Sequence, residues 1–131
     1  MAAEFETVFV RDAPLVVAPD GSDVRILPRR PGGSMAHFTL AAGTTSRAVE
    51  HRTVEEIWYV VGGAGEMWRA STAGEQVVAL TSGVALTFPL GTRFQFRAAA
   101  DAPLRVVAIT MPPWPGDDEA AAVAGPWEPT A

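Results

Sequence analysis

A chain of 131 residues can bury one hydrophobic core but is short for two ordinary domains, so we expect a single domain over residues 1–131. Fifteen acidic against ten basic residues give a net charge of −5, which argues against nucleic acid or an anionic membrane as the main partner. The absence of cysteine excludes disulfides, a thiolate zinc site and a cysteine nucleophile.

The beginning of the chain carries no targeting signal that we recognise. It is acidic and lacks the basic region and apolar run of a secretory signal peptide. No apolar stretch approaches the roughly 20 residues that a membrane helix needs. We therefore expect a soluble, cytoplasmic protein.

Most of the chain consists of short segments with the composition of β-strands. They are rich in Val, Ile, Phe, Trp and Thr, and glycine, proline or Asp-Gly pairs lie between many of them. This spacing favours an all-β sandwich or closed barrel, and no window before residue 111 shows a sustained helical period. The predicted strands lie near 5–10, 14–18, 23–28, 34–41, 45–51, 56–61, 65–69, 75–80, 84–88, 93–98 and 104–111.

The predicted strand at 56–61 is apolar on both faces, because five apolar residues follow one another over 57–61. A strand of this kind is covered on both sides. One side would face the barrel interior, and the other would face a second sheet or a partner subunit. We therefore expect a homodimer.

The C-terminal tail, residues 111–131, has a different composition. Its first part is too rich in proline for a central strand or a helix. Asp117 as N-cap and Gly125 as stop would suit a helical turn between them. Trp114 and Trp127 are large enough to anchor the tail over the barrel, although they would equally serve only to seal an edge of the core.

Two segments of the chain resemble the two motifs of the cupin superfamily. The glycines and the proline stand at the motif positions in the segments near 43–63 and 83–98, as Gly43, Gly63, Gly83, Pro89 and Gly91. The resemblance implies a small single-domain cupin, an all-β jelly-roll barrel (double-stranded β-helix) followed by the short tail. It implies little about activity, since cupins host many unrelated functions.

The metal-ligand set that the resemblance implies is incomplete. His51 and Glu56 stand at two of the four ligand positions, but Val49 and Phe94 replace the other two histidines. Hydrocarbon side chains donate no lone pair, so a divalent metal (Fe, Mn, Ni or Zn) would have only His51 and Glu56 as protein ligands. His37 could add a third ligand if it points inward, which strand alternation leaves open. The cofactor is therefore unknown, with none as one of the alternatives.

Period-two alternation within this implied barrel aims one set of side chains at the interior. Around His51 and Glu56 we expect an apolar, aromatic pocket typical of a small-molecule site. The residues expected to bind the substrate are Arg47, Val49, Trp58, Phe94 and Phe96.

The predicted pocket places a carboxylate in apolar surroundings, so Glu56 must be protonated, paired or hydrogen-bonded. His51 is the obvious partner, and a His–Glu pair in a dry pocket can act as general base and acid. Three alternatives remain: the pair performs catalysis, it ligates a metal, or it only ties two strands together.

These alternatives lead to three functional hypotheses. The first is a metal-independent enzyme that isomerises, cyclises or dehydrates an apolar or aromatic metabolite, with His51 and Glu56 as catalytic residues. The second is a metal-dependent cupin oxygenase with atypical ligands. The third is a non-catalytic metabolite-binding protein. We favour the first.

Overall fold

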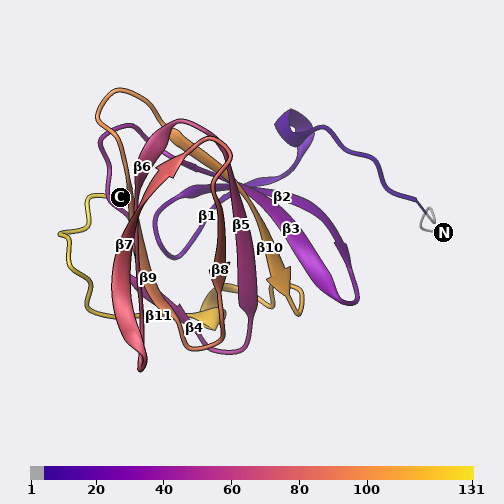
Figure 1. Cartoon of the computed structure of the whole chain (residues 1–131). Coiled ribbons are helices and arrows are strands. Elements are labelled where there is room, and N and C mark those ends of the chain that lie inside the picture. Colours follow the sequence, from indigo (N-terminus) through magenta and orange to yellow (C-terminus); the bar gives the residue numbers. More distant parts are fainter. Residues whose placement is uncertain (1–4) are drawn as a thin grey trace.

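The computed structural model describes residues 5–131 as two β-sheets that face each other (Figure 1). Helical structure in these residues is confined to two short 3-10 turns, η1 (Val10–Asp12) and η2 (Asp117–Glu119). The strands are β1 (Leu15–Val17), β2 (Asp23–Arg30), β3 (Gly33–Leu40), β4 (Val49–His51), β5 (Glu55–Gly62), β6 (Ala64–Ser71), β7 (Gly74–Thr81), β8 (Ala85–Phe88), β9 (Arg93–Ala98), β10 (Leu104–Met111) and β11 (Ala120–Ala122).

The strand order is that of a jelly roll. One sheet has the order β1-β2-β3-β10-β5-β8, and the other has the order β11-β4-β9-β6-β7. All paired strands run antiparallel, and β10 lies between β3 and β5 although it is distant from both in sequence. The predicted all-β jelly-roll barrel is confirmed.

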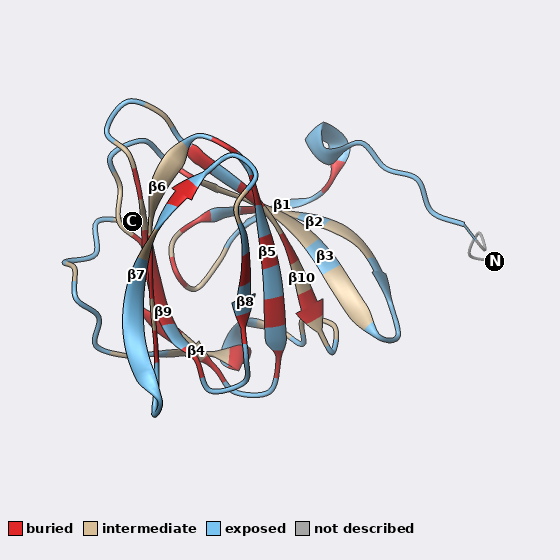
Figure 2. Cartoon of the chain, in the orientation of Figure 1, coloured by how far each residue is buried: buried red, intermediate tan, exposed pale blue. Residues whose placement is uncertain are grey.

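Alternation along the strands creates the interior. In β5 the residues alternate strictly between exposed and buried, starting from exposed Glu55 and buried Glu56 (Figure 2). Side chains two residues apart share a face, so Trp58 and Val60 enter the same interior as Glu56. Both are fully buried, and this side of the apolar run 57–61 therefore forms core.

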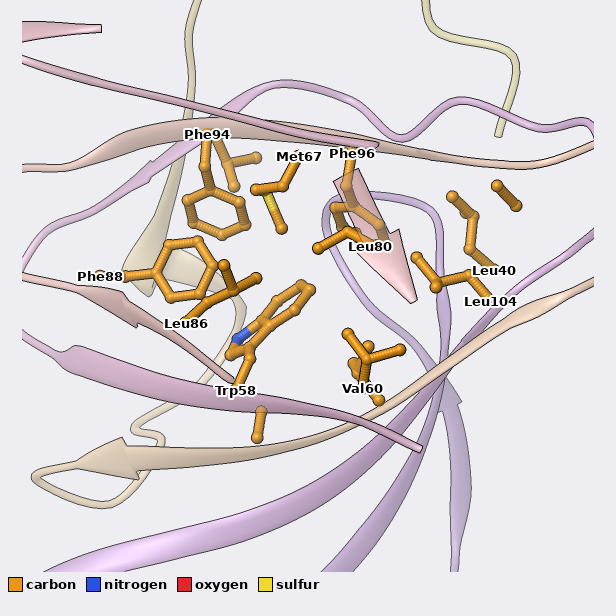
Figure 3. Close-up of a cluster of buried hydrophobic side chains, with 14 residues drawn as sticks. Leu40, Trp58, Val60, Met67, Leu80, Leu86, Phe88, Phe94, Phe96 and Leu104 are labelled. Carbon is orange, nitrogen blue, oxygen red and sulfur yellow. The ribbon is translucent and has the colours of Figure 1, made fainter. Parts of the chain in front are cut away.

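The centre of the barrel is packed with aromatic rings (Figure 3). Trp58 contacts three phenylalanines with centroid separations of 5.0–5.8 Å, namely Phe88, Phe94 and Phe96. These separations and the tilted or edge-on ring angles are those favoured by aromatic quadrupoles. The middle of the barrel is thus filled, and a cavity opens toward one end of it.

Two predicted strands and one predicted helical turn need correction. The described residues between 5 and 10 form no strand and instead lead into η1. Only 49–51 of the predicted strand 45–51 is regular, because Ser46, Ala48 and Val49 are all buried and alternation breaks down. The predicted helical turn after 117 is limited to η2, with Gly116 and not Asp117 as its N-cap, and the chain then pairs with β4 as β11.

The C-terminal tail closes over the second sheet through buried polar contacts. Glu119 accepts hydrogen bonds from the backbone N–H groups of Thr53 and Val54, at 2.6 and 3.1 Å, and from the Thr53 hydroxyl. Further along, the amide of Gln95 bonds the backbone of Trp127 in both directions. No helix in the described residues is long and apolar enough to cross a membrane.

Candidate functional site

A cavity of about 320 Å³ opens at the end of the barrel where the tail crosses it. Its walls come from β1, the β1–β2 turn, β2, β3 and the tail, while β4, β5, β9 and β10 contribute its inner end. Most of the lining is apolar. The buried polar side chains that face it are Asp20, His51, Glu56 and Thr110.

His51 enters the cavity from the last position of β4, on the same face as Val49. Its imidazole is 9 % exposed and is held between two aromatic rings. Phe94 and Trp114 both meet it edge-on, at centroid separations of 5.2 and 5.1 Å. Burial in this apolar setting lowers the pKa of His51 from 6.5 to about 4, and the carboxylate of Glu119 only partly offsets this effect.

Glu56 enters the same cavity from β5 and is 3 % exposed. Its Oε2 atom lies 3.5 Å from Nδ1 of His51 and accepts a hydrogen bond from the Trp58 indole N–H at 3.2 Å. Burial raises the pKa of Glu56 from 4.5 to about 8. The Trp58 bond lowers it in part, while the nearby carboxyl of Asp20 raises it further.

The two opposed shifts define the protonation state of the pair. Between pH 4 and 8 the imidazole is neutral and the carboxyl group is protonated. The pair then holds as many protons as an ion pair would, but the dry surroundings favour the uncharged form. Two groups whose pKa values are driven apart in this way are suited to act as base and acid.

Trp114 belongs to the site, which sequence reasoning did not predict. The hydroxyls of Ser34 on β3 and Thr110 on β10 hydrogen-bond each other, and the Ser34 oxygen accepts the backbone N–H of Trp114 at 2.9 Å. This anchor holds the indole against the His51 ring at the cavity wall. The signals in the sequence were the proline-rich composition around Trp114 and the size of its side chain, and these suggested an anchor for the tail and not a residue of the site.

Two of the five predicted substrate-binding residues line the cavity. Val49 and Phe94, which are neighbours in register between β4 and β9, both do so. Trp58 and Phe96 point inward as expected, but they are packed in the filled core beneath the cavity. Arg47 is exposed, and its guanidinium lies 3.5 Å from the carbonyl oxygen of Pro19. Its expected place in the pocket is wrong, because the chain before β4 is irregular.

The donor set does not fit a resident metal ion. His37 lies on the outer face of its sheet, in register with Val107, while Phe38 beside it packs against the core. It therefore adds no third ligand to His51 and Glu56. Nowhere in residues 5–131 do three His, Asp or Glu side chains gather as metal ligands would. With hydrocarbon at the other two motif positions, two donors remain where stable sites use three or four.

The fold and this largely apolar cavity define a β-barrel with a pocket inside one end, of the kind in which small molecules are bound. The family model "Cupin domain" matches residues 36–110, more than half of the chain, and the chain belongs to the cupin family. No curated protein sequence matches it significantly.

Solved structures with the same fold include enzymes of different chemistry. The Streptomyces Pac13 structure, described as a unique nucleoside dehydratase, has a TM-score of 0.71 at 16 % identity and covers 91 % of both chains. KdgF from a Halomonas species gives 0.68 at 19 % identity, covering 79 % of this chain and 92 % of KdgF. A variant of oxalate decarboxylase from Bacillus subtilis has a TM-score of 0.74 at 12 % identity, and the match covers 87 % of this chain and 31 % of the decarboxylase. At these identities the likeness establishes the fold alone.

Proposed function

We propose that this cupin is a metal-independent enzyme that eliminates water from, or isomerises, an uncharged and partly apolar metabolite. The observation that carries the proposal is the approach of His51 to Glu56 in a largely apolar cavity, where both groups are buried and their pKa values are shifted in opposite directions. The two groups thereby hold the protonation states of a base and an acid at neutral pH. The similarity in fold to Pac13, described as a nucleoside dehydratase, is consistent with this class of reaction.

The hydrogen bonds around Glu56 assign the roles. Oε2 already accepts the Trp58 N–H and faces Nδ1 of His51, so we assign the acid proton to Oε1 and the basic lone pair to Nε2. In an elimination, Nε2 removes a proton from carbon, the carbon–carbon double bond forms and the adjacent carbon–oxygen bond breaks. The departing hydroxide takes the Oε1 proton and leaves as water. After the product leaves, Nε2 releases the abstracted proton to water and Oε1 takes one up from water, which restores the neutral pair with its original proton positions.

The test does not require the natural substrate to be known. The purified protein is incubated in deuterated water with a panel of uncharged β-hydroxy carbonyl compounds, and products are analysed by mass spectrometry. Loss of water reports elimination, and deuterium uptake reports proton abstraction alone. His51→Asn and Glu56→Gln should each reduce turnover at least 100-fold, the low end of the range for acid–base catalysis.

Two outcomes would contradict the proposal, the first by rejecting the role of His51 and Glu56 and the second by rejecting an enzyme. Full turnover in both variants would place the chemistry elsewhere. Uridine, which is bound in structures of Streptomyces Pac13 variants, serves as a binding probe. Binding of uridine that is equal in the wild type and both variants, with no turnover of any panel compound, would instead indicate a metabolite-binding protein.

We also propose that the protein forms a homodimer through the outer face of the larger sheet. Ile57, Tyr59 and Val61 on this face of β5 are 45 %, 50 % and 36 % exposed. Across the sheet, Ile109 and Met35 continue the row that begins at Ile57. None of residues 5–131 of the same chain covers this apolar patch, and such patches usually mark an interface.

A second copy of the chain is the occupant that suits this patch. The segment before β1 extends away from the barrel (Figure 1) and leaves Phe5 and Phe9 82 % and 65 % exposed. Between residues 5 and 14 the charged residues of this segment are Glu6, Arg11 and Asp12, which leave it with a net negative charge. On the patch side of the sheet, the pKa of His37 is lowered mainly by burial and further by the positive charges of the nearby Arg105 and Arg25. An apolar, acidic arm and an apolar, basic face in one chain can be exchanged between two copies related by a two-fold axis.

A further inference from the structure

Asp20 is a buried acid that the proposed reaction does not use. It lies in the turn between β1 and β2, is 5 % exposed and lines the same cavity as His51 and Glu56. From the sequence, Asp20 and Gly21 were only a turn signal. A buried carboxyl group needs partners, since removing it from water is costly.

The turn uses only one of the two carboxyl oxygens. Oδ1 of Asp20 accepts the backbone N–H of Ser22 at 2.9 Å and the Ser22 hydroxyl at 2.6 Å. No hydrogen bond within the described residues uses Oδ2. Burial raises the pKa of Asp20, and the charge of the nearby Arg47 offsets this only in part, while the Arg47 guanidinium is directed to the carbonyl oxygen of Pro19 and not to Oδ2. The hydrogen bonds of the turn therefore satisfy Oδ1 and leave Oδ2 available to a molecule in the cavity.

The other polar groups of the cavity are partly committed to one another. The hydroxyls of Ser34 and Thr110 bond each other and hold the tail at Trp114. The atoms left for a ligand are Oδ2 of Asp20 and the reactive atoms of His51 and Glu56. The remaining lining is largely apolar, and no buried cation faces it, since the lining Arg29 is exposed. An anionic ligand would thus meet two acids without a buried counter-charge.

We propose that Asp20 is a ligand-binding residue whose Oδ2 atom hydrogen-bonds a second polar group of the substrate. The inference rests on the proposed function and narrows its substrate class. The substrate is an uncharged molecule with an apolar body and polar groups, such as hydroxyls, at two positions. One group lies at the His51–Glu56 pair and the other at Asp20.

Small aromatic probes test this arrangement directly. p-Xylene carries no hydroxyl, 4-methylbenzyl alcohol carries one, and 1,3- and 1,4-benzenedimethanol carry two. Their dissociation constants are measured by NMR titration with the wild type and with Asp20→Ser, in which the shorter hydroxyl can still cap the turn but does not reach the cavity. For the diol that binds the wild type more tightly, we expect the affinity for Asp20→Ser to be about 3- to 10-fold lower, which is the effect of one hydrogen bond. The affinity for p-xylene should be the same in both proteins.

Two matched variants separate ligand binding from turn stability. Ser22→Ala removes one of the bonds to Oδ1 and leaves Oδ2 in place, so it should lower the melting temperature without weakening the diols. Asp23→Asn removes an exposed acid nearby and should change neither quantity. If Asp20→Ser does not fold, the carboxyl ¹³C resonance of Asp20 in the labelled wild type replaces it. Saturating diol should shift this resonance and p-xylene should not.

The outcomes distinguish this inference from the proposed function. Diol affinity that is unchanged by Asp20→Ser, equal weakening by Ser22→Ala, or an Asp20 resonance that does not respond to diol would each overturn the role of Asp20. Tightest binding by the charged analogues 4-(hydroxymethyl)benzylamine or 4-(hydroxymethyl)benzoate would overturn the uncharged class. A loss of diol affinity that is specific to Asp20→Ser supports the inference even if no β-hydroxy carbonyl compound is turned over. The lack of turnover would then count only against the proposed enzyme activity.

Discussion

The indole of Trp114 meets the imidazole of His51 edge-on, with ring centroids 5.1 Å apart. This contact joins the C-terminal tail to the residue proposed as the base. The tail therefore does more than seal an edge of the core, because it forms one wall of the cavity and helps to keep water from the His51–Glu56 pair.

Replacing Trp114 by alanine should admit water to His51. Burial is the main cause of the low pKa of this imidazole, so the pKa should rise from about 4 toward 6.5. NMR titration of the imidazole protons measures this, and the chain has only two histidines to resolve. His37 on the outer face is the internal reference. Trp127→Ala, which disturbs the small cluster around Trp68, is the matched control and should leave His51 unchanged. A His51 titration unaffected by Trp114→Ala would contradict the shielding role.

The stability of the protein should decline between pH 6.5 and 8. In this range the folded state keeps the Glu56 proton that the unfolded chain has released, so raising the pH favours unfolding. Between pH 4.5 and 6.5 the opposite shift of His51 compensates. The loss above pH 6.5 amounts to about 2 kcal/mol, since one unit of pKa is worth about 1.4 kcal/mol. Urea unfolding at several pH values measures it, and Glu56→Gln should remove this component of the decline. A wild-type curve parallel to that of Glu56→Gln would refute the shift.

Turnover should be constant between pH 4 and 8. Below this range His51 becomes protonated and cannot accept a proton, and above it Glu56 is ionised and cannot donate one. Trp58→Phe removes the N–H donor that favours the ionised carboxylate, so the upper limb should move to higher pH while the lower limb stays. The profile of kcat/KM against pH tests both limbs, because it reports the pKa values of the free enzyme. Movement of the lower limb instead would mean that the assignment of acid and base is reversed.

Transition metals should not stabilise the wild type, because it offers only two ligands at the motif positions. Restoring the other two with Val49→His and Phe94→His should create a site, since these residues are in register and line the cavity beside His51. Thermal melts with and without Zn²⁺, Ni²⁺, Mn²⁺ or Fe²⁺ compare the two proteins. The double variant loses core packing and should melt at a lower temperature than the wild type. The relevant quantity is therefore the rise in its own melting temperature when metal is added. A rise in the melting temperature of the wild type on adding metal would support the metal-dependent alternative instead.

Tyr59→Arg should convert a dimer into a monomer, because it places a charge in the centre of the exposed patch. Light scattering coupled to size-exclusion chromatography measures the mass of the particle. Removing residues 1–9 should have the same effect if the arm covers the patch, while Val77→Arg, at another exposed apolar position on β7, should leave the dimer intact. A monomeric wild type would refute the proposed homodimer.

The sequence was informative where short-range rules apply. Glycines and proline at motif spacing indicated the turns, and period-two alternation placed Glu56 and Trp58 on one face of their strand. The same rule failed before β4, because Arg47 lies in an irregular stretch where alternation no longer decides direction.

Other features depended on segments that meet only after the sheets have paired. The sheet order brings Asp20 to the cavity, and the path of the tail brings Trp114 against His51; no local pattern encodes either placement. The opposed pKa shifts belong to the same class, because burial is produced by the whole packed barrel and not by a residue's neighbours in sequence. The local patterns indicated an all-β fold, and the resemblance to the cupin motifs singled out the pair at 51 and 56, whereas tertiary packing decided what surrounds that pair.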